Sequence, residues 1–422
     1  MTLDGATVVV VGAGYAGKRG AYRKITDLGV RLVIVEEPGH WSEALVAEGI
    51  AAAWLPVPVT GDADVDAGAI VDALERAGER PAAALTYWED SVGAAARVAA
   101  ALGLPGNPPE AVDSARSKIR MREVSAQLGL PTPKAQRVRS LDELYAAAGA
   151  IGFPAVVKPE FGASAMGCVR VDDSESLPGI YRLVRNVVRP ETDGIFRAGN
   201  DLLLEEYLDG VEFDVDLVME DGERRFASVS QNWPTAEPSL QETGLHCPAD
   251  HSRRAVNGLV DLCVDTARAF GLHRGVLHVE GKCTSQGPRI VEVNTRMGGG
   301  RIHEIVEAVW GVDLVEAQLR SSLDLPHVLR PSRRPRCAVI NAFLHAPASG
   351  RLEAVPLRDI RAEGEIGVAV DLNVEPGQEV VGREQIFATL LGMVTVSARN
   401  LRRARSLTEE LLRDPPVVAA PA

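Results

Sequence analysis

The residues from 290 to 296 read Ile290-Val-Glu292-Val-Asn294-Thr-Arg296, and they give the strongest structural signal in the chain. Apolar and polar residues alternate, which predicts a strand whose side chains two positions apart face the same way. Glu292 and Asn294 then point to one side of a sheet, while Val291 and Val293 pack behind it. Carboxylate and amide oxygens at this spacing suit Mg²⁺.

Two residues close to this strand extend the predicted site. Glu280 ends the apolar run 276–280, which predicts the preceding strand. Its carboxylate can complete a site for one or two ions bridged by nucleotide phosphates, with Mn²⁺ as an acceptable substitute for Mg²⁺. Arg296 lies just beyond Asn294 and can bind an oxygen that gains negative charge during a reaction.

Further upstream, a loop of small residues follows Lys158, which ends the apolar run 155–158. The backbone amides of such a loop can lie over phosphates, with Gly162, Ser164 and Gly167 as the expected contacts. Lys118, in a basic helix, supplies a second cation for the phosphates. A lysine at a strand end is also common in solvent, so Lys158 is informative only beside that second cation.

An acidic segment at residues 202–212 offers what an adenosine needs. The backbone of residues 206–208 can pair with the adenine edge, and Glu212 can accept hydrogen bonds from both ribose hydroxyls. Acid pairs at strand ends are common on protein surfaces, so this segment alone is a weak signal. The nucleotide contacts expected in it are Glu205, Glu206, Tyr207, Leu208 and Glu212.

The N-terminus contains a competing nucleotide signal. Residues 12–17 form GxGxxG between a predicted strand and a predicted helix, and Glu36 ends the next strand, as in NAD-binding folds. The same turn reads as GxxxxGK through Lys18, but Arg19 stands where a phosphate loop needs a hydroxyl group for Mg²⁺. A tight turn at the edge of a parallel sheet explains the glycines equally well.

In order and spacing, these features resemble the ATP-grasp superfamily over about residues 114–321, roughly half of the chain. The hinge at 202–212 is similar to that of D-alanine:D-alanine ligase, and the run 292–296 with residues 310–316 resembles biotin carboxylase. The run Arg296-Met-Gly-Gly-Gly300 is similar instead to carnosine synthase and the bacterial L-amino-acid ligases.

The resemblance implies ATP and Mg²⁺ as cofactors and a role for each residue. By it, Lys118 and Lys158 bind phosphates, residues 206–208 form the adenine hinge and Glu212 binds ribose. The implied Mg²⁺ ligands are Glu280, Glu292 and Asn294, and Arg296 is the implied catalytic residue.

The resemblance also implies a reaction: an ATP-dependent ligase that forms an amide, as in a dipeptide, through an acyl phosphate with release of ADP and phosphate. A biotin-carboxylase-like enzyme fits less well, because residues 298–300 replace the acidic stretch after its arginine. An NAD-binding oxidoreductase leaves half of the chain unexplained. A regulatory protein without turnover predicts loss of the metal or arginine positions, which are all present.

In amino-acid ligases of this kind the substrate meets the segment between the hinge strands and the metal strands. Here Glu242 can hold a substrate ammonium, and His246 can orient a carboxylate or accept a proton. A solvated loop acid and a hydrogen-bonded histidine are at least as good as interpretations of these two residues. The other expected substrate contacts, around the glycine turn, are Gly298, Gly299, Arg301 and His303.

The fold class that follows is α/β: an ATP-grasp fold with an N-terminal doubly wound parallel-sheet domain and a C-terminal α+β lobe. We expect domains at residues 1–110, 111–325 and 326–422, with a helix near residues 382–391. A net charge of -13 disfavours nucleic acid and anionic membranes as partners, and leaves small-molecule substrates. Five scattered cysteines and the absence of a signal-like start predict a cytoplasmic protein, with a homodimer left open.

Overall fold

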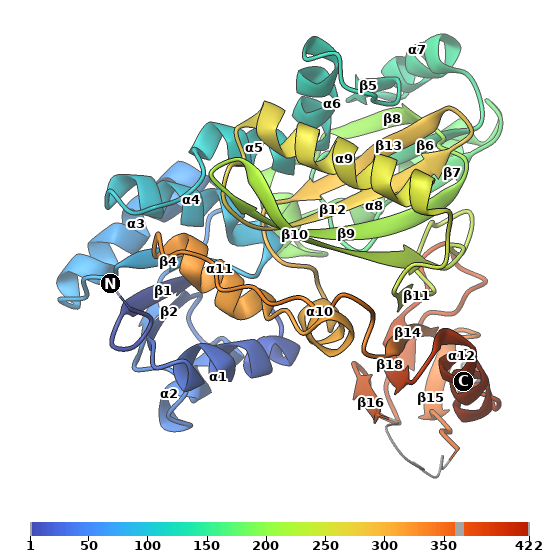
Figure 1. The fold of residues 1–422 in the computed structure, drawn as a ribbon. Helices are drawn as coiled ribbons and strands as arrows, with labels where there is room; N and C mark the ends of the chain where they lie inside the picture. The colour runs from blue at the N-terminus through green and yellow to red at the C-terminus, as the bar shows by residue number, and fades with distance from the viewer. Residues whose placement is uncertain (1, 359–366, 421–422) are drawn as a thin grey trace.

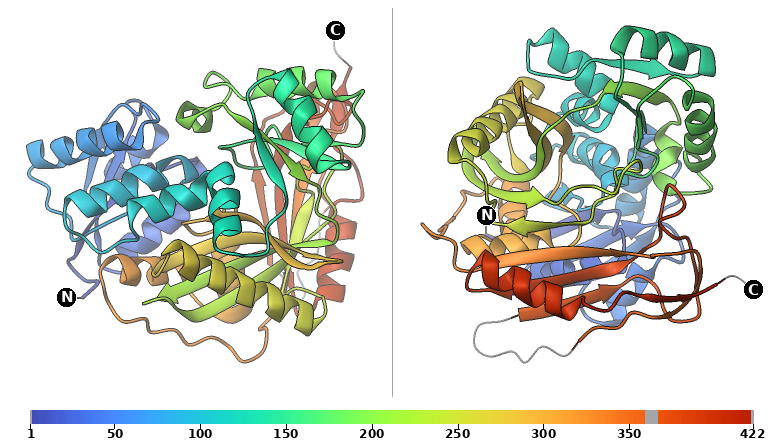
Figure 2. Two further views of the ribbon diagram at one scale, coloured as in Figure 1. Left: turned by 90° about the horizontal axis from the view of Figure 1, so that it is seen from above. Right: turned by 90° about the vertical axis from the view of Figure 1, so that its right-hand side faces the viewer.

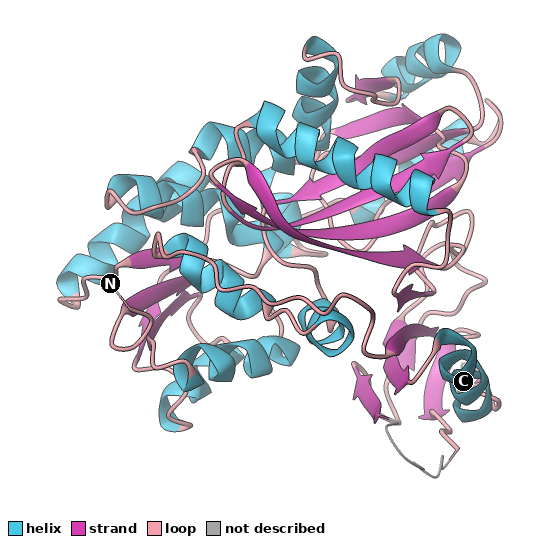
Figure 3. Ribbon diagram, viewed as in Figure 1, coloured by secondary structure: helices cyan, strands magenta, loops and turns pink. Residues whose placement is uncertain are grey.

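The computed structural model describes residues 2–358 and 367–420 (Figure 1). Its N-terminal unit is the predicted parallel sheet, with the strand order β3-β2-β1-β4. Helices flank both faces of this sheet (Figure 3), because the side chains of β1 alternate between two apolar clusters. The elements are β1 (Thr7–Val11), α1 (Arg19–Asp27), β2 (Arg31–Glu36), α2 (Ala44–Ala47), β3 (Ala53–Pro56), α3 (Ala63–Arg76), β4 (Ala83–Leu85) and α4 (Val92–Ala101).

A small antiparallel sheet follows, with the order β5-β8-β6-β7. Ser140 caps α7 by accepting a hydrogen bond from the Glu143 amide, as its position before an acidic first turn predicts. The elements are α5 (Pro109–Arg116), α6 (Lys118–Gln127), β5 (Ala135–Val138), α7 (Leu141–Ile151), β6 (Ala155–Pro159), β7 (Val169–Val171), α8 (Leu177–Val187) and β8 (Leu202–Glu206).

The largest sheet is antiparallel and has eight strands, in the order β13-β12-β9-β10-β11-β14-β18-β16. Helix α9 lies across one face of it, and α10 and α11 connect it to the N-terminal unit (Figure 1). The elements are β9 (Val211–Glu220), β10 (Glu223–Asn232), β11 (Gly244–Cys247), α9 (Arg253–Phe270), β12 (Gly275–Thr284), β13 (Gly287–Asn294), α10 (Ile302–Trp310), α11 (Leu314–Ser322), β14 (Ala338–His345), β16 (Gly367–Leu372) and β18 (Leu390–Ala398).

The C-terminal lobe is built onto this large sheet. The sheet runs across the division expected near residue 325, because β11 pairs with β14 and β14 with β18. Figure 2 shows the last helix (red) packed beside these strands. The remaining elements are β15 (Gly350–Ala354), β17 (Glu379–Val380), α12 (Leu401–Leu411) and β19 (Val417–Ala419).

Two local expectations are corrected by the structure. The segment 382–389 consists of turns and irregular backbone that lead into β18, so the helix expected near residues 382–391 is wrong. The alternation in β13 is interrupted by a bulge, since Glu280 pairs with Glu292 while Gly281 pairs with Ile290. Val291 is the extra residue of this bulge and stays outside the apolar cluster that includes Val293.

None of the helices in the described residues combines the length and the apolarity needed to cross a membrane.

Candidate active site

The two carboxylates predicted to bind metal face each other across neighbouring strands. Glu280 of β12 pairs with Glu292 of β13, and Asn294 lies opposite His278 in the same ladder. Burial, the Glu292 carboxylate and Asp214 raise the pKa of Glu280 well above its ordinary value. Two half-buried carboxylates and an amide oxygen on one sheet face form a donor set that a hard divalent cation would stabilise.

Within the described residues, no group of three or more His, Cys, Asp and Glu side chains is arranged as a metal site. The predicted ligand set contains two carboxylates only, and its third member is the Asn294 amide. A Mg²⁺ ion held by this set would take its further oxygen ligands from phosphates and water, as is usual for that ion.

Lys118 lies directly beside the carboxylate pair. It is the first residue of α6, and its Nζ is 3.1 Å from Glu292 Oε1 and donates to the Gly162 carbonyl oxygen at 3.3 Å. Burial lowers the pKa of Lys118, but the attraction of Glu292 outweighs it and the pKa is raised. The sequence predicted that this lysine binds phosphates, and the structure places it beside both the Gly162 loop and the predicted metal ligand Glu292.

Lys158 forms part of a buried ion cluster. The Glu205 carboxylate forms two ion pairs. Its Oε1 lies 2.6 Å from Lys158 Nζ, and its Oε2 lies 2.5 Å from Arg122 Nε. Burial raises the pKa of Glu205, but these two cations outweigh it and lower the pKa to about 2. Arg122 also donates to the Val291 carbonyl oxygen at 2.7 Å, so the cluster ties α6 and β8 to β13. Glu205 therefore positions the cations, and sequence reasoning missed Arg122.

The loop after Lys158 contains residues with left-handed backbone conformations. Ser164 and Ala165 have positive φ angles of 53° and 54°, and Gly167 has a φ angle of 78°. A Cβ atom at Gly167 would meet Val188 at 3.1 Å and Pro159 at 3.3 Å, so the loop packs closely at that point.

Two backbone amides of the hinge segment are already hydrogen-bonded within the protein. The amide of Glu206 donates to the Lys134 carbonyl oxygen at 2.8 Å, and that of Tyr207 donates to Pro154 at 3.3 Å. No hydrogen bond from the Leu208 amide is formed to any of the described residues, which leaves it available to an adenine edge. Glu212 lies 3.4 Å from Lys282 Nζ, and its contact with ribose stays a prediction.

Arg296 is held from two sides. Its Nη2 donates to Asn294 Oδ1 at 3.2 Å, and its Nε is 2.8 Å from Glu89 Oε2. Glu89 opens the short 3₁₀ helix Glu89–Ser91 after β4, so the N-terminal unit supplies the carboxylate that pairs with this guanidinium. No sequence pattern singled out Glu89, which is buried despite its charge.

The expected substrate residues fall into two groups. Glu242 faces the carboxylate side of the sheet, where burial, Asp214 and Glu212 raise its pKa to about 8. His246 alternates with Leu245 and Cys247, which join the apolar cluster under α10, so it faces the other side of the sheet. There its Nδ1 accepts from Trp233 Nε1 at 3.3 Å. The position of His246 therefore does not support a substrate contact.

The residues around the glycine turn are already engaged or enclosed. Arg301 Nη2 donates to Asp371 Oδ1 of β16 at 3.0 Å and also contacts Glu304, so its cation is neutralised within the protein. His303 is buried, and burial with the nearby Lys18 charge lowers its pKa to about 3. Arg301 is therefore not free for the substrate carboxylate that the sequence suggested for it. His303 Nδ1 has no hydrogen-bond partner among the described residues, and a substrate contact of His303 stays a prediction.

The two predicted glycines of the turn differ in their surroundings. A Cβ atom at Gly298 would lie 2.8 Å from His278 Nδ1, so the backbone passes close to that ring. A Cβ atom at Gly299 would meet nothing within 4 Å. Close packing explains the first glycine, and a substrate contact at either one stays a prediction.

Side chains of the protein itself pack against the N-terminal glycine turn. Glu36 Oε2 accepts from the Ala13 amide at 2.6 Å, so the acid expected to read a ribose caps the turn instead. A Cβ atom at Gly12 would lie 2.0 Å from Ser91 Oγ, and one at Gly14 would lie 2.5 Å from the Trp88 ring. These side chains occupy the space in which a pyrophosphate would approach the backbone.

We therefore expect isothermal calorimetry to detect no binding of NAD or NADP, and to detect binding of Mg·ATP. The physical reason is the packing of Ser91 and Trp88 against the turn. Micromolar binding of either dinucleotide, with none of ATP, would return the oxidoreductase hypothesis to first place.

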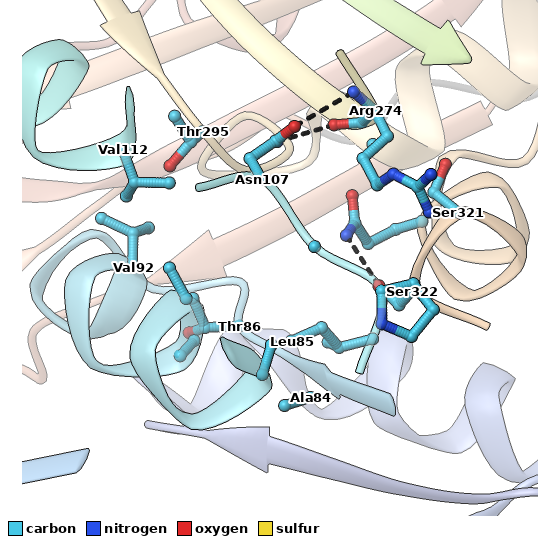
Figure 4. A pocket seen from close by; sticks show the side chains of 17 residues that line it. Ala84, Leu85, Thr86, Val92, Asn107, Val112, Arg274, Thr295, Ser321 and Ser322 are labelled. Carbon is cyan, nitrogen blue, oxygen red and sulfur yellow. Dashed lines mark hydrogen bonds between the residues drawn. The ribbon is translucent and has the colours of Figure 1, made fainter. Parts of the chain in front are cut away.

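A separate cavity lies where the N-terminal unit meets β12 and α11 (Figure 4). Asn107 lies at its edge, where its side chain donates to the Arg274 carbonyl oxygen and accepts from the Arg274 amide. None of the predicted nucleotide, metal or substrate residues lines this cavity, although Thr295 does. Its position therefore marks a junction between units, behind the strand that holds the predicted metal ligands.

Comparisons with known proteins find two matching domain models in the chain. Residues 151–304 match the sequence model of the ATP-grasp domain, and residues 22–106 match that of the ATP-grasp N-terminal domain. Carnosine synthase 1 of Gallus gallus is 35% identical over 366 residues, which cover 83% of this chain and 38% of that protein. The alanine–anticapsin ligase of Bacillus subtilis is 25% identical over 232 residues, which cover 52% of this chain and 49% of that protein. The chain thus spans less than half the length of these two relatives.

Among solved structures, the L-amino acid ligase from Bacillus licheniformis has a similar fold. It superposes with a TM-score of 0.82 at 21% identity, over 98% of this chain and 99% of that chain. At this identity the likeness concerns the fold alone.

Proposed function

We propose that this chain, which belongs to the ATP-grasp superfamily, is an ATP-dependent ligase that joins a carboxylate to an amine. The fold implied by the sequence resemblance is confirmed by the two matched domains and by the solved neighbour. One observation carries the functional proposal: Lys118, Glu280, Glu292, Asn294 and Arg296 are linked by direct contacts or strand pairing into a single group.

The residues of this group fit Mg·ATP. Glu280, Glu292 and Asn294 would hold Mg²⁺, since they share one sheet face and the closeness of the two half-buried carboxylates favours a divalent cation. Lys118 and Lys158 would meet the phosphates, and the backbone of residues 206–208 would meet the adenine. The bound nucleotide supplies the phosphoryl group that turns a carboxylate into a good acyl donor.

The protein residues then have separate tasks. The substrate carboxylate attacks the γ-phosphate, and an acyl phosphate and ADP result. The amine of the second substrate attacks the acyl carbon, phosphate leaves, and the amide forms. Arg296 would stabilise the oxygen that becomes negative in both steps, because Glu89 and Asn294 hold its guanidinium in one place.

Amino acids are the substrates that we favour. Two relatives, carnosine synthase 1 and the alanine–anticapsin ligase, are named for dipeptide-type ligation. Glu242 adds a chemical reason, because a half-buried carboxylate that faces Asp214 would be stabilised by the ammonium group of a substrate.

We expect a productive pair of amino acids, with Mg·ATP, to release ADP and inorganic phosphate in equal amounts, one amide being formed per ATP. The lysines and the predicted metal ligands gather at the phosphate end of the site, which favours attack at the γ-phosphate. A matrix of amino acids, β-amino acids and small carboxylates is screened first for phosphate release and then by mass spectrometry for the amide. AMP as the nucleotide product would refute the acyl-phosphate mechanism.

A further inference from the structure

The N-terminal glycine turn ends in a buried lysine whose side chain contacts the glycine run after the predicted catalytic arginine. Lys18 closes the short 3₁₀ helix Ala16–Lys18, its residue is 1% exposed, and its Nζ donates to the Gly298 carbonyl oxygen at 3.4 Å. Gly298 follows Arg296 by two residues, so Lys18 lies next to the predicted catalytic arginine. The contact spans 280 residues of the sequence.

Among the described residues, the neighbouring cations have carboxylate partners. Arg296 pairs with Glu89 and Arg301 with Asp371, and His278 Nδ1 lies 2.8 Å from Asp216 Oδ1. Lys24, six residues after Lys18 and within α1, also has carboxylate partners. Its Nζ lies 2.9 Å from Asp313 Oδ2 and also contacts Glu307.

Lys18 differs from these cations in having no carboxylate within ion-pair distance among the described residues. An ammonium group has three donors, and here a single long hydrogen bond to a carbonyl oxygen satisfies one of them. A buried charge with so few partners is unfavourable until an anion approaches it. Burial and the Arg296 charge lower the pKa of Lys18 to about 7, which agrees with a missing counterion.

The glycines of the turn explain how the lysine reaches this place. A Cβ atom at Gly17 would lie 2.3 Å from the Tyr15 ring, and the turn also packs against Trp88 and Ser91 through Gly14 and Gly12. The turn is thereby held tightly at the end of β1, and the residue after it is inserted beneath the glycine run 298–300. The GxGxxG turn, which resembles a dinucleotide-binding motif, thus positions the Lys18 side chain.

We propose that Lys18 binds the free carboxylate of the amino acid whose amine attacks the acyl phosphate. This inference rests on the proposed ligase function. The carboxylate that is activated loses its charge as the acyl phosphate forms, whereas the carboxylate of the attacking amino acid stays negative throughout. In an α-amino acid that group is one carbon away from the reacting amine, and Lys18 Nζ correspondingly contacts the carbonyl oxygen of Gly298, two residues after Arg296.

A phosphate group is the less suitable anion for Lys18. Lys118 and Lys158 lie at the end of the site marked by Glu292, Glu205 and the loop after Lys158. Lys18 lies at the other end of the segment from Glu292 to Gly298, on the side of the N-terminal unit.

The test compares amino acids with their α-carboxamides, which lack the negative charge. Calorimetry measures binding of a panel of L-amino acids and the matching amides, in the presence of Mg²⁺ and a non-hydrolysable ATP analogue. The unaltered protein is expected to bind at least one amino acid more tightly than its amide. In Lys18→Met the affinity for that amino acid falls on the order of 10²-fold, whereas the affinity for the amide hardly changes, because one partner of a buried charge pair is lost.

Two further variants separate charge from packing. Lys18→Arg keeps the cation and should retain part of the preference for the carboxylate, even if Lys18→Met is poorly folded. Lys24→Met is the matched control on α1, the helix that follows Lys18, because Lys24 already has Asp313 and Glu307 as partners and lies outside the site. It should bind the whole panel as the unaltered protein does.

An unchanged preference for the carboxylate in folded Lys18→Met would overturn the proposal. Failure of the unaltered protein to distinguish any amino acid from its amide would overturn it as well. Neither result affects the ligase proposal, which is judged separately by the release of ADP and phosphate with amide formation.

Discussion

The Glu292→Gln variant is expected to lose most of its ligase activity while it stays folded. The change removes one of the two facing carboxylates and also the partner of Lys118 at 3.1 Å. The core of this region uses Val293 and Val279, which the substitution leaves in place. Mg²⁺ binding should weaken by at least about 10- to 100-fold, the usual effect of disturbing even the support of a metal ligand. Asn294→Ala should act in the same direction.

Rates measured against Mg²⁺ concentration test this assignment, and melting curves check the fold. Glu223→Gln is a suitable control, because Glu223 is an exposed carboxylate of the same large sheet that pairs with Arg268. A normal kcat for Glu292→Gln at saturating Mg²⁺ would show that this carboxylate does not serve the metal.

The Arg296→Ala variant should lose on the order of 10² to 10³ in kcat, as is found when a single oxyanion donor is removed. The affinity for Mg·ATP should change little, since Lys118, Lys158 and the hinge are left intact. Loss of the guanidinium also leaves Glu89 buried without its 2.8 Å partner, so a lower melting temperature is expected as well.

Single-turnover rates of phosphate release distinguish the chemical step from binding. Arg289→Ala is the matched control on the same strand, because Arg289 donates only to the carbonyl oxygens of Gln286 and Pro288 in the described structure. A fall in kcat of less than about tenfold for Arg296→Ala would exclude the role that we assign to this arginine.

The strand β13 with its predicted metal ligands was predictable because its signal is local. Alternation of apolar and polar residues placed Glu292 and Asn294 on one face, and a second acid at the end of the preceding strand, Glu280, proved to lie opposite Glu292. The same reasoning failed at Val291, where the bulge inserts one residue into the ladder. A bulge of this kind leaves no recognisable mark in the pattern of residues.

The partners of the site residues were not predictable, because they come from distant parts of the chain. Glu89 reaches Arg296 from the N-terminal unit, and Asp371 reaches Arg301 from the C-terminal lobe. Nothing in the sequence around Glu89 distinguishes it from a surface acid. Arg301 and His303 resemble free substrate ligands for the same reason, since only the fold shows what already surrounds them.

The eight-stranded sheet has a consequence for how this protein can have evolved and how it can be recombined. Because β14 takes its register from β11, the lobe after residue 338 is joined to the rest through backbone hydrogen bonds as well as through a linker. A foreign lobe spliced in at that linker would have to present a strand of matching length and register, or leave the polar edge of β11 open. Gene fusion and domain swapping are therefore disfavoured at this point, and the lobe and the catalytic sheet are expected to have changed together.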